Sequence, residues 1–144
     1  TQHTELMEQF LAAKEMIHIS NSAIDEEVAY RFWPQKERFA KAINNKCMQN
    51  FEVLQQWLQK EKRLECVMPQ GGVVCFPRFV SNIKVDTEKF YRILMQQFKT
   101  MVGPGHWFAM PDTYMRIGFG WIDQPTLKTG LENISKAIDA SEAL

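Results

Sequence analysis

The pattern of apolar and polar residues predicts helices in the N-terminal part of the chain. Apolar residues recur near helical spacing over residues 4–16, and a second helix is expected to begin after Ser22, a capping residue. Pro34 should end or kink this second helix near Trp33. Beyond the proline, one apolar stripe runs along a long helix to about Lys60 and consists of Ile43, Cys47, Phe51, Leu54 and Leu58. We expect one face of the long helix to be buried.

From Leu64 the pattern changes to short apolar segments. The segments "LECVMP" and "VVCFPRF" flank Gly71 and Gly72 and predict a β-hairpin, in which Cys66 and Cys75 would lie opposite each other on paired strands. Farther along, "VGPGHWFAM" predicts a turn that leads into a short strand, and "YMRIGFG" predicts the next strand. Strands therefore dominate the middle of the chain.

Two further helices are predicted in the C-terminal half. Asp86 is a good cap for the first, whose apolar stripe is Phe90, Leu94, Phe98 and Met101. Asp123 and Pro125 open the second, whose stripe is Leu127, Leu131, Ile134 and Ile138. The predicted fold class is α+β: N-terminal helices, one of them long, followed by a small, mainly antiparallel sheet with helices packed on one face.

The segment "YMRIGFGW", residues 114–121, places an arginine on an unusual strand face. Strand side chains alternate, so one face would carry Met115, Ile117, Phe119 and Trp121, and the other Tyr114, Arg116, Gly118 and Gly120. Glycine within a strand often marks the close approach of a ligand. We therefore expect Arg116 to face a space for an anion, and its planar guanidinium suits a carboxylate. The alternative is a surface arginine in an ordinary ion pair.

Composition narrows the class of protein. The 144 residues are 45% hydrophobic and 24% charged, as in a soluble domain with a real core. The formal net charge is zero and no apolar segment approaches the length of a membrane helix, so neither nucleic acid nor a membrane is an expected partner. Three cysteines without C-x-x-C spacing argue against a disulfide framework or a metal site and favour free thiols in a reducing, cytoplasmic compartment.

The remaining candidates do not assemble an active site. His106 has no aspartate, serine or cysteine at a recognisable offset. The charged runs 25–27 and 61–63 are typical of solvated helix surface, and the glycine pairs lack the spacing of phosphate-binding loops. Arg116 is the one residue for which composition and spacing support a binding role.

Five segments occur in an order that resembles the C-terminal part of the class I/II aminotransferases, pyridoxal-phosphate enzymes of the aspartate aminotransferase fold type. They are "PQGGVVCFPRF", "DTEKFYRILMQQF", "VGPGHWF", "YMRIGFGW" and "LKTGLENISKAI", and they cover about residues 63–140. The resemblance implies that Arg116 binds the substrate α-carboxylate on a face that Gly118 and Gly120 keep clear. It places Gly71 and Gly72, in a "P-x-G-G" turn, near the substrate entrance, and implies that the turn with Pro104, Gly105 and Phe108 supports the site.

The chain also departs from that family. The "S-x-S-K" segment with the cofactor lysine is missing, as are the "N-P-x-N-P-x-G" and "D-x-x-Y" segments that hold the cofactor ring. We therefore expect no catalytic or cofactor-binding residue in this chain. Residues 1–62 would be a helical segment leading into a small α/β domain, residues 63–144, while the large cofactor-binding domain is absent. Since the first residue is Thr1, we expect a fragment of a longer enzyme. Because the fragment lacks the cofactor lysine, we expect it to be inactive by itself.

By resemblance, the full-length parent would be a homodimer that uses pyridoxal phosphate to transfer an amino group between an amino acid and a 2-keto acid. Two alternatives stay open. The same scaffold could act as a β-lyase or a decarboxylase, because a fold does not determine its chemistry. The chain could instead be a non-enzymatic α+β dimerisation module, in which Arg116 pairs with a carboxylate of its own chain.

Overall fold

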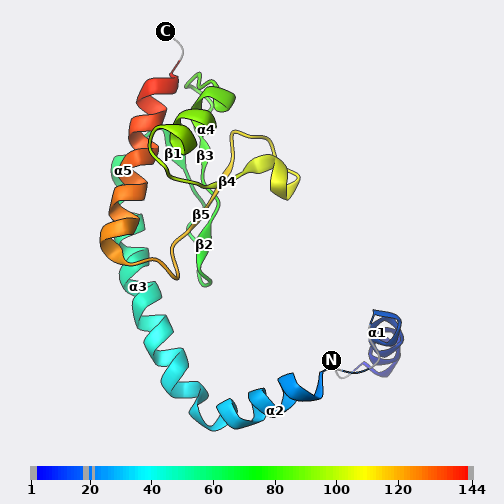
Figure 1. The fold of residues 1–144 in the computed structure, drawn as a ribbon. Helices are drawn as coiled ribbons and strands as arrows, with labels where there is room; N and C mark the ends of the chain where they lie inside the picture. The colour runs from blue at the N-terminus through cyan, green and yellow to red at the C-terminus, as the bar shows by residue number, and fades with distance from the viewer. Residues whose placement is uncertain (1–2, 18–19, 21, 143–144) are drawn as a thin grey trace. The chain divides into compact units, whose positions relative to one another are not determined.

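A computed structural model of the protein describes residues 3–17, 20 and 22–142. Contacts divide the chain into two compact units, Thr1–Ala40 and Lys41–Leu144, which are described separately. The elements, labelled in Figure 1, are α1 (Thr4–Ile17), α2 (Ala23–Phe32), the 3-10 helix η1 (Trp33–Gln35), α3 (Lys36–Lys60), β1 (Leu64–Glu65), β2 (Val74–Cys75), β3 (Arg78–Phe79), α4 (Thr87–Gln96), β4 (Gly103–Pro104), the 3-10 helix η2 (Gly105–Phe108), β5 (Met115–Gly118) and α5 (Gln124–Ser141).

The first unit consists of the predicted helices. The backbone N–H of Asp25 donates to Ser22 Oγ at 3.4 Å, which confirms the predicted cap of α2. Pro34 lies in η1, where α2 ends, because proline cannot continue a helix without losing a backbone hydrogen bond. No described residue of α1 or α2 is buried. Most of the break expected between these helices falls on residues 18, 19 and 21, outside the described residues.

The second unit contains the strands, and every pairing is antiparallel. β1 pairs with β3, with Leu64 opposite Phe79, while β5 lies between β2 and β4. β1 and β3 therefore pair as the arms of the predicted hairpin. Their register does not place Cys66 opposite Cys75, as the sequence predicted, because Cys75 lies in β2 and pairs with Ile117 of β5. The order expected for "VGPGHWFAM" is reversed, since strand β4 comes first and the turn η2 follows it.

The core lies between the sheet and the helices α3, α4 and α5. Asp86 and Asp123 cap α4 and α5 through the backbone N–H groups of Lys89 and Thr126. The buried side chains of these helices pack on the face of β5 that carries Met115, and they include Leu54, Phe90, Ile93, Leu94, Leu127, Leu131, Ile134 and Ile138. The predicted α+β class, with helices on one face of an antiparallel sheet, is therefore confirmed (Figure 1).

Two of the predicted apolar stripes are buried only in part. The α3 stripe is buried at Leu54, whereas Ile43 is exposed. In α4 the helix ends at Gln96, and Lys99 adopts a left-handed backbone with φ of 51°. The chain turns there, so Met101 leaves the stripe and is exposed.

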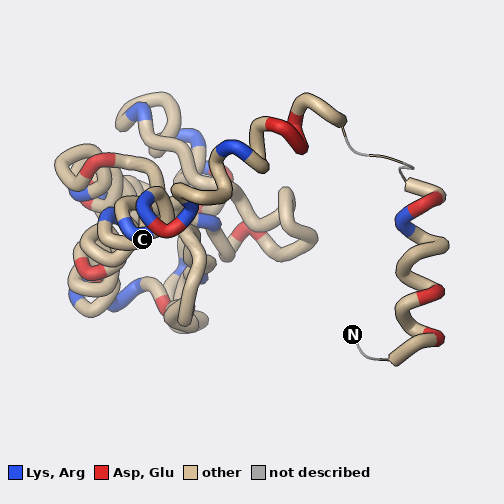
Figure 2. The backbone as a smooth tube through the Cα atoms, turned by 90° about the horizontal axis from the view of Figure 1, so that it is seen from below, with Lys and Arg blue, Asp and Glu red and all other residues tan. Residues whose placement is uncertain are grey.

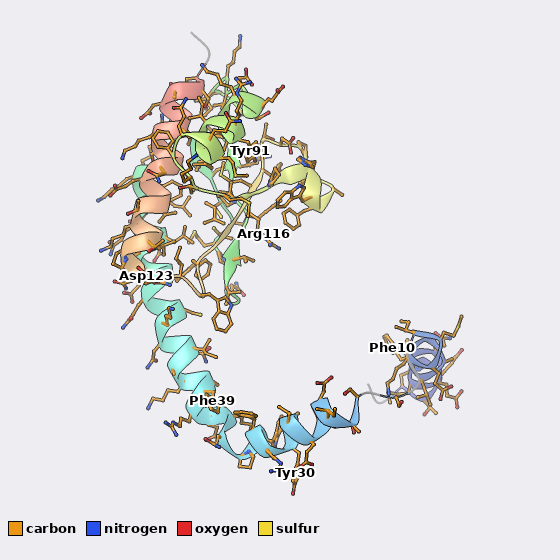
Figure 3. The ribbon with its side chains drawn as sticks, in the orientation of Figure 1. Phe10, Tyr30, Phe39, Tyr91, Arg116 and Asp123 are labelled. Atoms are coloured by element: carbon orange, nitrogen blue, oxygen red, sulfur yellow. The ribbon has the colours of Figure 1, made fainter. Side chains whose placement is uncertain are left out.

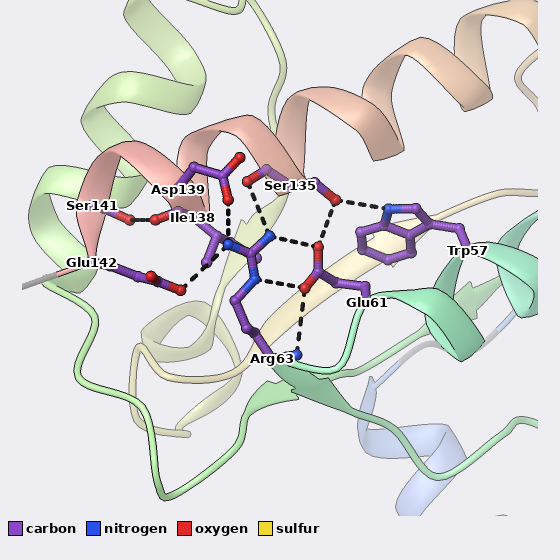
Figure 4. A network of polar contacts seen from close by, with 8 residues as sticks. All are labelled: Trp57, Glu61, Arg63, Ser135, Ile138, Asp139, Ser141 and Glu142. Atoms are coloured by element: carbon purple, nitrogen blue, oxygen red, sulfur yellow. Dashed lines mark hydrogen bonds and ion pairs between the residues drawn. The ribbon is translucent and has the colours of Figure 1, made fainter.

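The run 61–63 is not solvated helix surface, contrary to the sequence prediction. Glu61, just after α3, is only 7% exposed, and its carboxylate receives two hydrogen bonds from Arg63, Nε–Oε1 at 2.7 Å and Nη2–Oε2 at 2.8 Å (Figure 4). Ser135 Oγ donates to the same carboxylate at 2.7 Å and accepts from Trp57 Nε1 at 3.0 Å. Arg63 also reaches Asp139, so this network joins the end of α3 to α5.

Charge is spread without a dominant sign. Figure 2 shows basic and acidic residues interspersed along the described chain, in keeping with the net charge of zero. None of the described helices combines the length and apolar character that crossing a membrane requires. Among the described residues, no group of three or more histidine, cysteine or carboxylate side chains is placed to hold a metal ion.

Candidate functional site

Strand β5 positions Arg116 on the exposed face of the sheet. Met115, Ile117 and Phe119 are buried against the helices, whereas Arg116 and Gly118 are exposed. The predicted alternation is thus confirmed from residue 115 to residue 119. Figure 3 shows the side chain of Arg116 on the side of the sheet away from α5.

The alternation fails at the end of the predicted segment. β5 ends at Gly118. A Cβ on Gly120 would lie 2.5 Å from Val73 Cβ, so the side chain of Val73 occupies the space beside Gly120 and leaves no room there for a ligand. Trp121 was expected to share the face of Met115, Ile117 and Phe119, but these three are buried whereas Trp121 is 76% exposed. The chain turns here because Asn50 Nδ2 on α3 donates to the carbonyls of residues 119 and 122, at 2.7 and 2.8 Å.

Phe108 and Gly103 form the immediate surroundings of Arg116. The guanidinium carbon lies 4.6 Å from the centre of the Phe108 ring, a cation–π contact. Gly103 lies opposite Arg116 in the β4–β5 pair. A Cβ on Gly103 would approach the Phe108 ring to 2.9 Å and Arg116 Cβ to 3.4 Å, so the absence of a side chain at Gly103 makes room for both. Sequence reasoning missed Gly103, because nothing in the sequence shows which residue lies opposite Arg116.

Arg116 has no acidic partner within the described chain. Its guanidinium makes no ion pair or hydrogen bond with any described residue. Arg78, on the same face, is different: its Nε pairs with Glu65 at 2.7 Å and its Nη1 donates to Tyr114 Oη at 3.0 Å. Because the Phe108 ring covers only one face of the Arg116 guanidinium, the N–H groups in its plane can still bind an anion.

Gly118 shares the face of Arg116, but Gly71 and Gly72 do not lie beside it. A Cβ on Gly118 would meet nothing within 4 Å, so this part of the face is open. The β2–β5 register puts residue 76 opposite Arg116, and Gly72 lies four residues farther along, roughly 13 Å away at the rise of a strand.

The two glycines line a hollow of about 290 Å³ together with residues of α3 and with Phe119. Gly72 has φ of 88°, which favours glycine there. The structure therefore brings Arg116 and Gly118 together and leaves Gly71 and Gly72 in a separate hollow.

His106 has an aspartate partner at an offset that the sequence analysis did not recognise. Its Nδ1 lies 2.7 Å from Asp112 Oδ1, which also accepts the backbone N–H of His106 at 3.0 Å. These contacts lower the pKa of Asp112, the backbone hydrogen bond most of all. The two residues are six apart and lie in a turn, where neither helical nor strand spacing predicts a contact, so the sequence could not reveal the pair. The pair closes the turn that carries Phe108 and so helps to position the ring beneath Arg116.

Gly105 is a position at which we expect a substitution to disturb this turn. A Cβ on Gly105 would lie 1.9 Å from the backbone oxygen of Pro111, so Gly105→Ala must displace the turn. We expect it to lower the free energy of unfolding by about 2 kcal/mol, as overpacking does. Thermal or urea unfolding of the 144-residue chain measures this.

Gly118→Ala is the matched control, because its new Cβ meets open space. Its effect should stay within about 0.5 kcal/mol, typical of exposed positions. Equal losses in both variants would contradict the close approach at Gly105.

The chain matches the family described as Aminotransferase class I and II over residues 25–134. It is 27% identical over 135 residues to a capreomycidine synthase of Streptomyces vinaceus, an alignment that covers 93% of this chain and 34% of that protein. Its fold is similar to that of a PLP-dependent aminotransferase from Streptococcus suis, with a TM-score of 0.74 and 23% identity over 91% of this chain and 34% of that one. It is also similar to an α-aminoadipate aminotransferase from Thermus thermophilus, with a TM-score of 0.72 and 16% identity over 96% and 36%.

The protein belongs to the class I and II aminotransferase family, since the family match covers most of the chain. The resemblance found in the sequence is thereby confirmed. The chain spans about a third of the length of these relatives. The Thermus protein was solved as a complex with N-(5'-phosphopyridoxyl)-L-leucine, a cofactor joined to an amino acid.

The described residues do not form a site that fits pyridoxal phosphate. The family's cofactor is held through a lysine, yet every lysine here is exposed except the half-buried Lys89. A hollow of about 580 Å³ beside β3 is lined by Lys84, Arg78 and Asp86. Two of these charged groups already have structural partners, because Asp86 caps α4 and Arg78 pairs with Glu65. No step of the chemistry can be assigned to the cofactor from this chain.

Proposed function

We propose that this chain is the substrate-carboxylate-binding part of a pyridoxal-phosphate-dependent aminotransferase, which transfers an amino group between an amino acid and a 2-keto acid. The observation that carries the proposal is the unpaired guanidinium of Arg116 on an open strand face beside Gly118. Membership of the aminotransferase family supports it. An amino acid and a 2-keto acid share the α-carboxylate, so one arginine can serve both halves of the reaction.

The role of Arg116 in this proposal is to bind and orient the substrate. Its guanidinium presents parallel N–H donors that match both oxygens of a carboxylate. Phe108 lies over one face of the guanidinium at 4.6 Å and limits its rotation, so a bound carboxylate is held in a defined plane. Gly118 leaves room for the substrate next to this carboxylate, and Gly71 and Gly72 line the approach from their separate hollow.

The cofactor belongs, in this proposal, to a large domain outside this chain. Residues 1–62 lead into the small domain of residues 63–144, and the complete enzyme is a homodimer. The 144-residue chain by itself is inactive, because the described residues do not hold pyridoxal phosphate.

The test compares this chain with a protein that joins it to a cofactor-binding domain. Pyridoxal phosphate and an amino acid are added to each, and the cofactor's absorbance and the keto-acid product are followed. We expect the joined protein to change the cofactor's absorbance and release keto acid, and the 144-residue chain to do neither. Turnover by the 144-residue chain would show that its own residues form the cofactor site.

A second candidate function keeps the scaffold and changes the reaction. It is favoured by one observation: the curated relative is named a synthase and not an aminotransferase. β-Lyase or decarboxylase chemistry would use the same carboxylate contact at Arg116. Product analysis separates the candidates, since an aminotransferase yields a keto acid with aminated cofactor, whereas the others yield ammonia with pyruvate, or carbon dioxide.

A further inference from the structure

A hollow of about 360 Å³ is lined by α4 and by residues of the segment 100–112. We call it the α4 hollow, and the residues of its lining that bear on its chemistry are Glu88, Tyr91, Met95, Met101, Trp107 and Asp112. Its volume lies within the range of about 300–1,000 Å³ that is usual for small-molecule sites. Neither Arg116 nor Gly118 lines it, so it is separate from the candidate carboxylate site.

Three large apolar side chains of the α4 hollow face solvent. Met95, Met101 and Trp107 are each at least half exposed, although apolar side chains of this size are usually buried. The buried side chains of Leu94 and Val102 also line the hollow. Exposed apolar side chains that gather at one place often mark a ligand site, and methionine adapts to ligands of different shape. A ligand in the hollow would therefore cover apolar surface that is now in water.

Two hydroxyl groups of the hollow are already engaged within the protein. Tyr91 Oη, on the residue labelled in Figure 3, lies 2.8 Å from the carbonyl oxygen of Tyr114 and 3.1 Å from that of Asp112, so its single proton is used there. Thr100 Oγ1 donates to the carbonyl of Phe98 at 3.0 Å. These hydroxyl protons therefore leave nothing to donate to a ligand, and they fix the walls of the hollow.

Two carboxylates of the hollow keep free acceptor oxygens. Glu88 makes no ion pair or hydrogen bond with any residue that the structure describes. His106 contacts only one oxygen of Asp112, Oδ1, through its backbone N–H at 3.0 Å and its Nδ1 at 2.7 Å, which leaves Oδ2 without a partner in the described part of the chain. His106 is also the one basic side chain of the lining, and Asp112 already engages it. The hollow thus presents negative charge without a matching cation.

We propose that the α4 hollow binds a small organic cation with an apolar body, of the arylalkylammonium class. The ammonium group donates to the free oxygens of Glu88 and Asp112, since hydrogen bonds between ionised groups are the strong ones. The apolar body lies against Met95, Met101 and Trp107, and the indole face also attracts positive charge. A neutral or anionic ligand of the same shape cannot use the carboxylates. The inference does not depend on the carboxylate contact at Arg116 or on the proposed aminotransferase function.

Three probes with one aryl body and different head groups test the proposal on the 144-residue chain. They are 2-phenylethylammonium, neutral 2-phenylethanol and the anion 3-phenylpropionate, and each is titrated at neutral pH and low salt while the methionine methyl signals are followed by NMR. We expect the cation to shift the Met95 and Met101 signals saturably and to bind about 10-fold more tightly than the alcohol, with the anion weakest. Equal binding of cation and alcohol, or no saturable shift of these two methyl groups, would overturn the proposal.

Substitutions separate the charge of the hollow from its apolar wall. Glu88→Gln keeps the size of an exposed side chain and removes its charge, so the cation should bind about fivefold more weakly and the alcohol as before. Trp107→Leu, also at an exposed position, should weaken the binding of both probes. Glu132→Gln is the matched control, because Glu132 is exposed on α5 and does not line the hollow. Equal losses of cation binding in the Glu88 and Glu132 variants would mean that overall charge, and not this hollow, attracts the cation.

Discussion

Replacing Arg63 by methionine is expected to lower the free energy of unfolding by about 3 kcal/mol, since it leaves a buried carboxylate without its cation. Glu61 is only 7% exposed, and the side chain of Arg63, at 23%, is its main partner. The remaining donor, Ser135 Oγ, cannot replace two charged hydrogen bonds. Urea unfolding of the 144-residue chain at neutral pH measures the loss.

The same substitution should matter less in acid. Arg63 lowers the pKa of Glu61 below its ordinary value of 4.5 in the folded protein. The stabilisation by this pair is therefore complete above about pH 4.5 and disappears as the pH falls through the lower folded pKa. The difference between wild type and Arg63→Met should shrink over that range.

Arg78→Met is the matched control for Arg63. Its ion pair with Glu65 is about half exposed on both sides, at 49% and 48%, so its loss should cost less than about 1 kcal/mol. If the two variants lose equal stability, or if the effect of Arg63→Met does not depend on pH, the account of the Glu61 network is wrong.

Replacing Arg116 by glutamine should weaken the binding of amino acid and keto acid about 100-fold, equivalent to about 2.7 kcal/mol. Glutamine keeps a hydrogen-bond donor but loses the charge and the second parallel donor. Arg116→Lys restores the charge without the planar fork and should recover only part of the affinity. Titration of both substrates into the protein that joins this chain to a cofactor-binding domain gives the values.

Arg92→Gln provides the control for this effect. Arg92 is an exposed arginine on α4, and no ion pair with a described residue involves it. The Arg92→Gln variant should bind both substrates as the wild type does. An equal loss in the Arg92 and Arg116 variants would mean that overall charge, and not a specific contact, attracts the substrate.

Local signals in the sequence predicted much of the fold. The caps at Ser22, Asp86 and Asp123 were correct because a capping residue acts within its own first helical turn. The buried and exposed faces of residues 115–119 followed from the two-residue period of a strand. The placement of Arg116 on the exposed face was thus readable from the segment alone.

Long-range contacts could not be predicted in the same way. Gly120 was expected to be open, but Val73 fills its surroundings, and the two residues are brought together by the pairing of β2 with β5. Residues 61–63 were expected to be solvent-exposed because all three are charged. Ser135 on α5 instead donates a hydrogen bond to Glu61, and Asp139 on α5 pairs with Arg63. In each case the deciding partner is distant in the sequence, and a local pattern carries no information about it.

The most direct test of the account is whether Arg116 recognises the carboxylate itself. A substrate amino acid and its amide, which lacks the negative charge, are titrated into the wild type and into Arg116→Gln, both joined to a cofactor-binding domain. The account predicts that the substitution weakens binding of the acid about 100-fold and leaves binding of the amide nearly unchanged, a coupling that a double-mutant cycle isolates. Equal losses for acid and amide, or no loss for either, would contradict it.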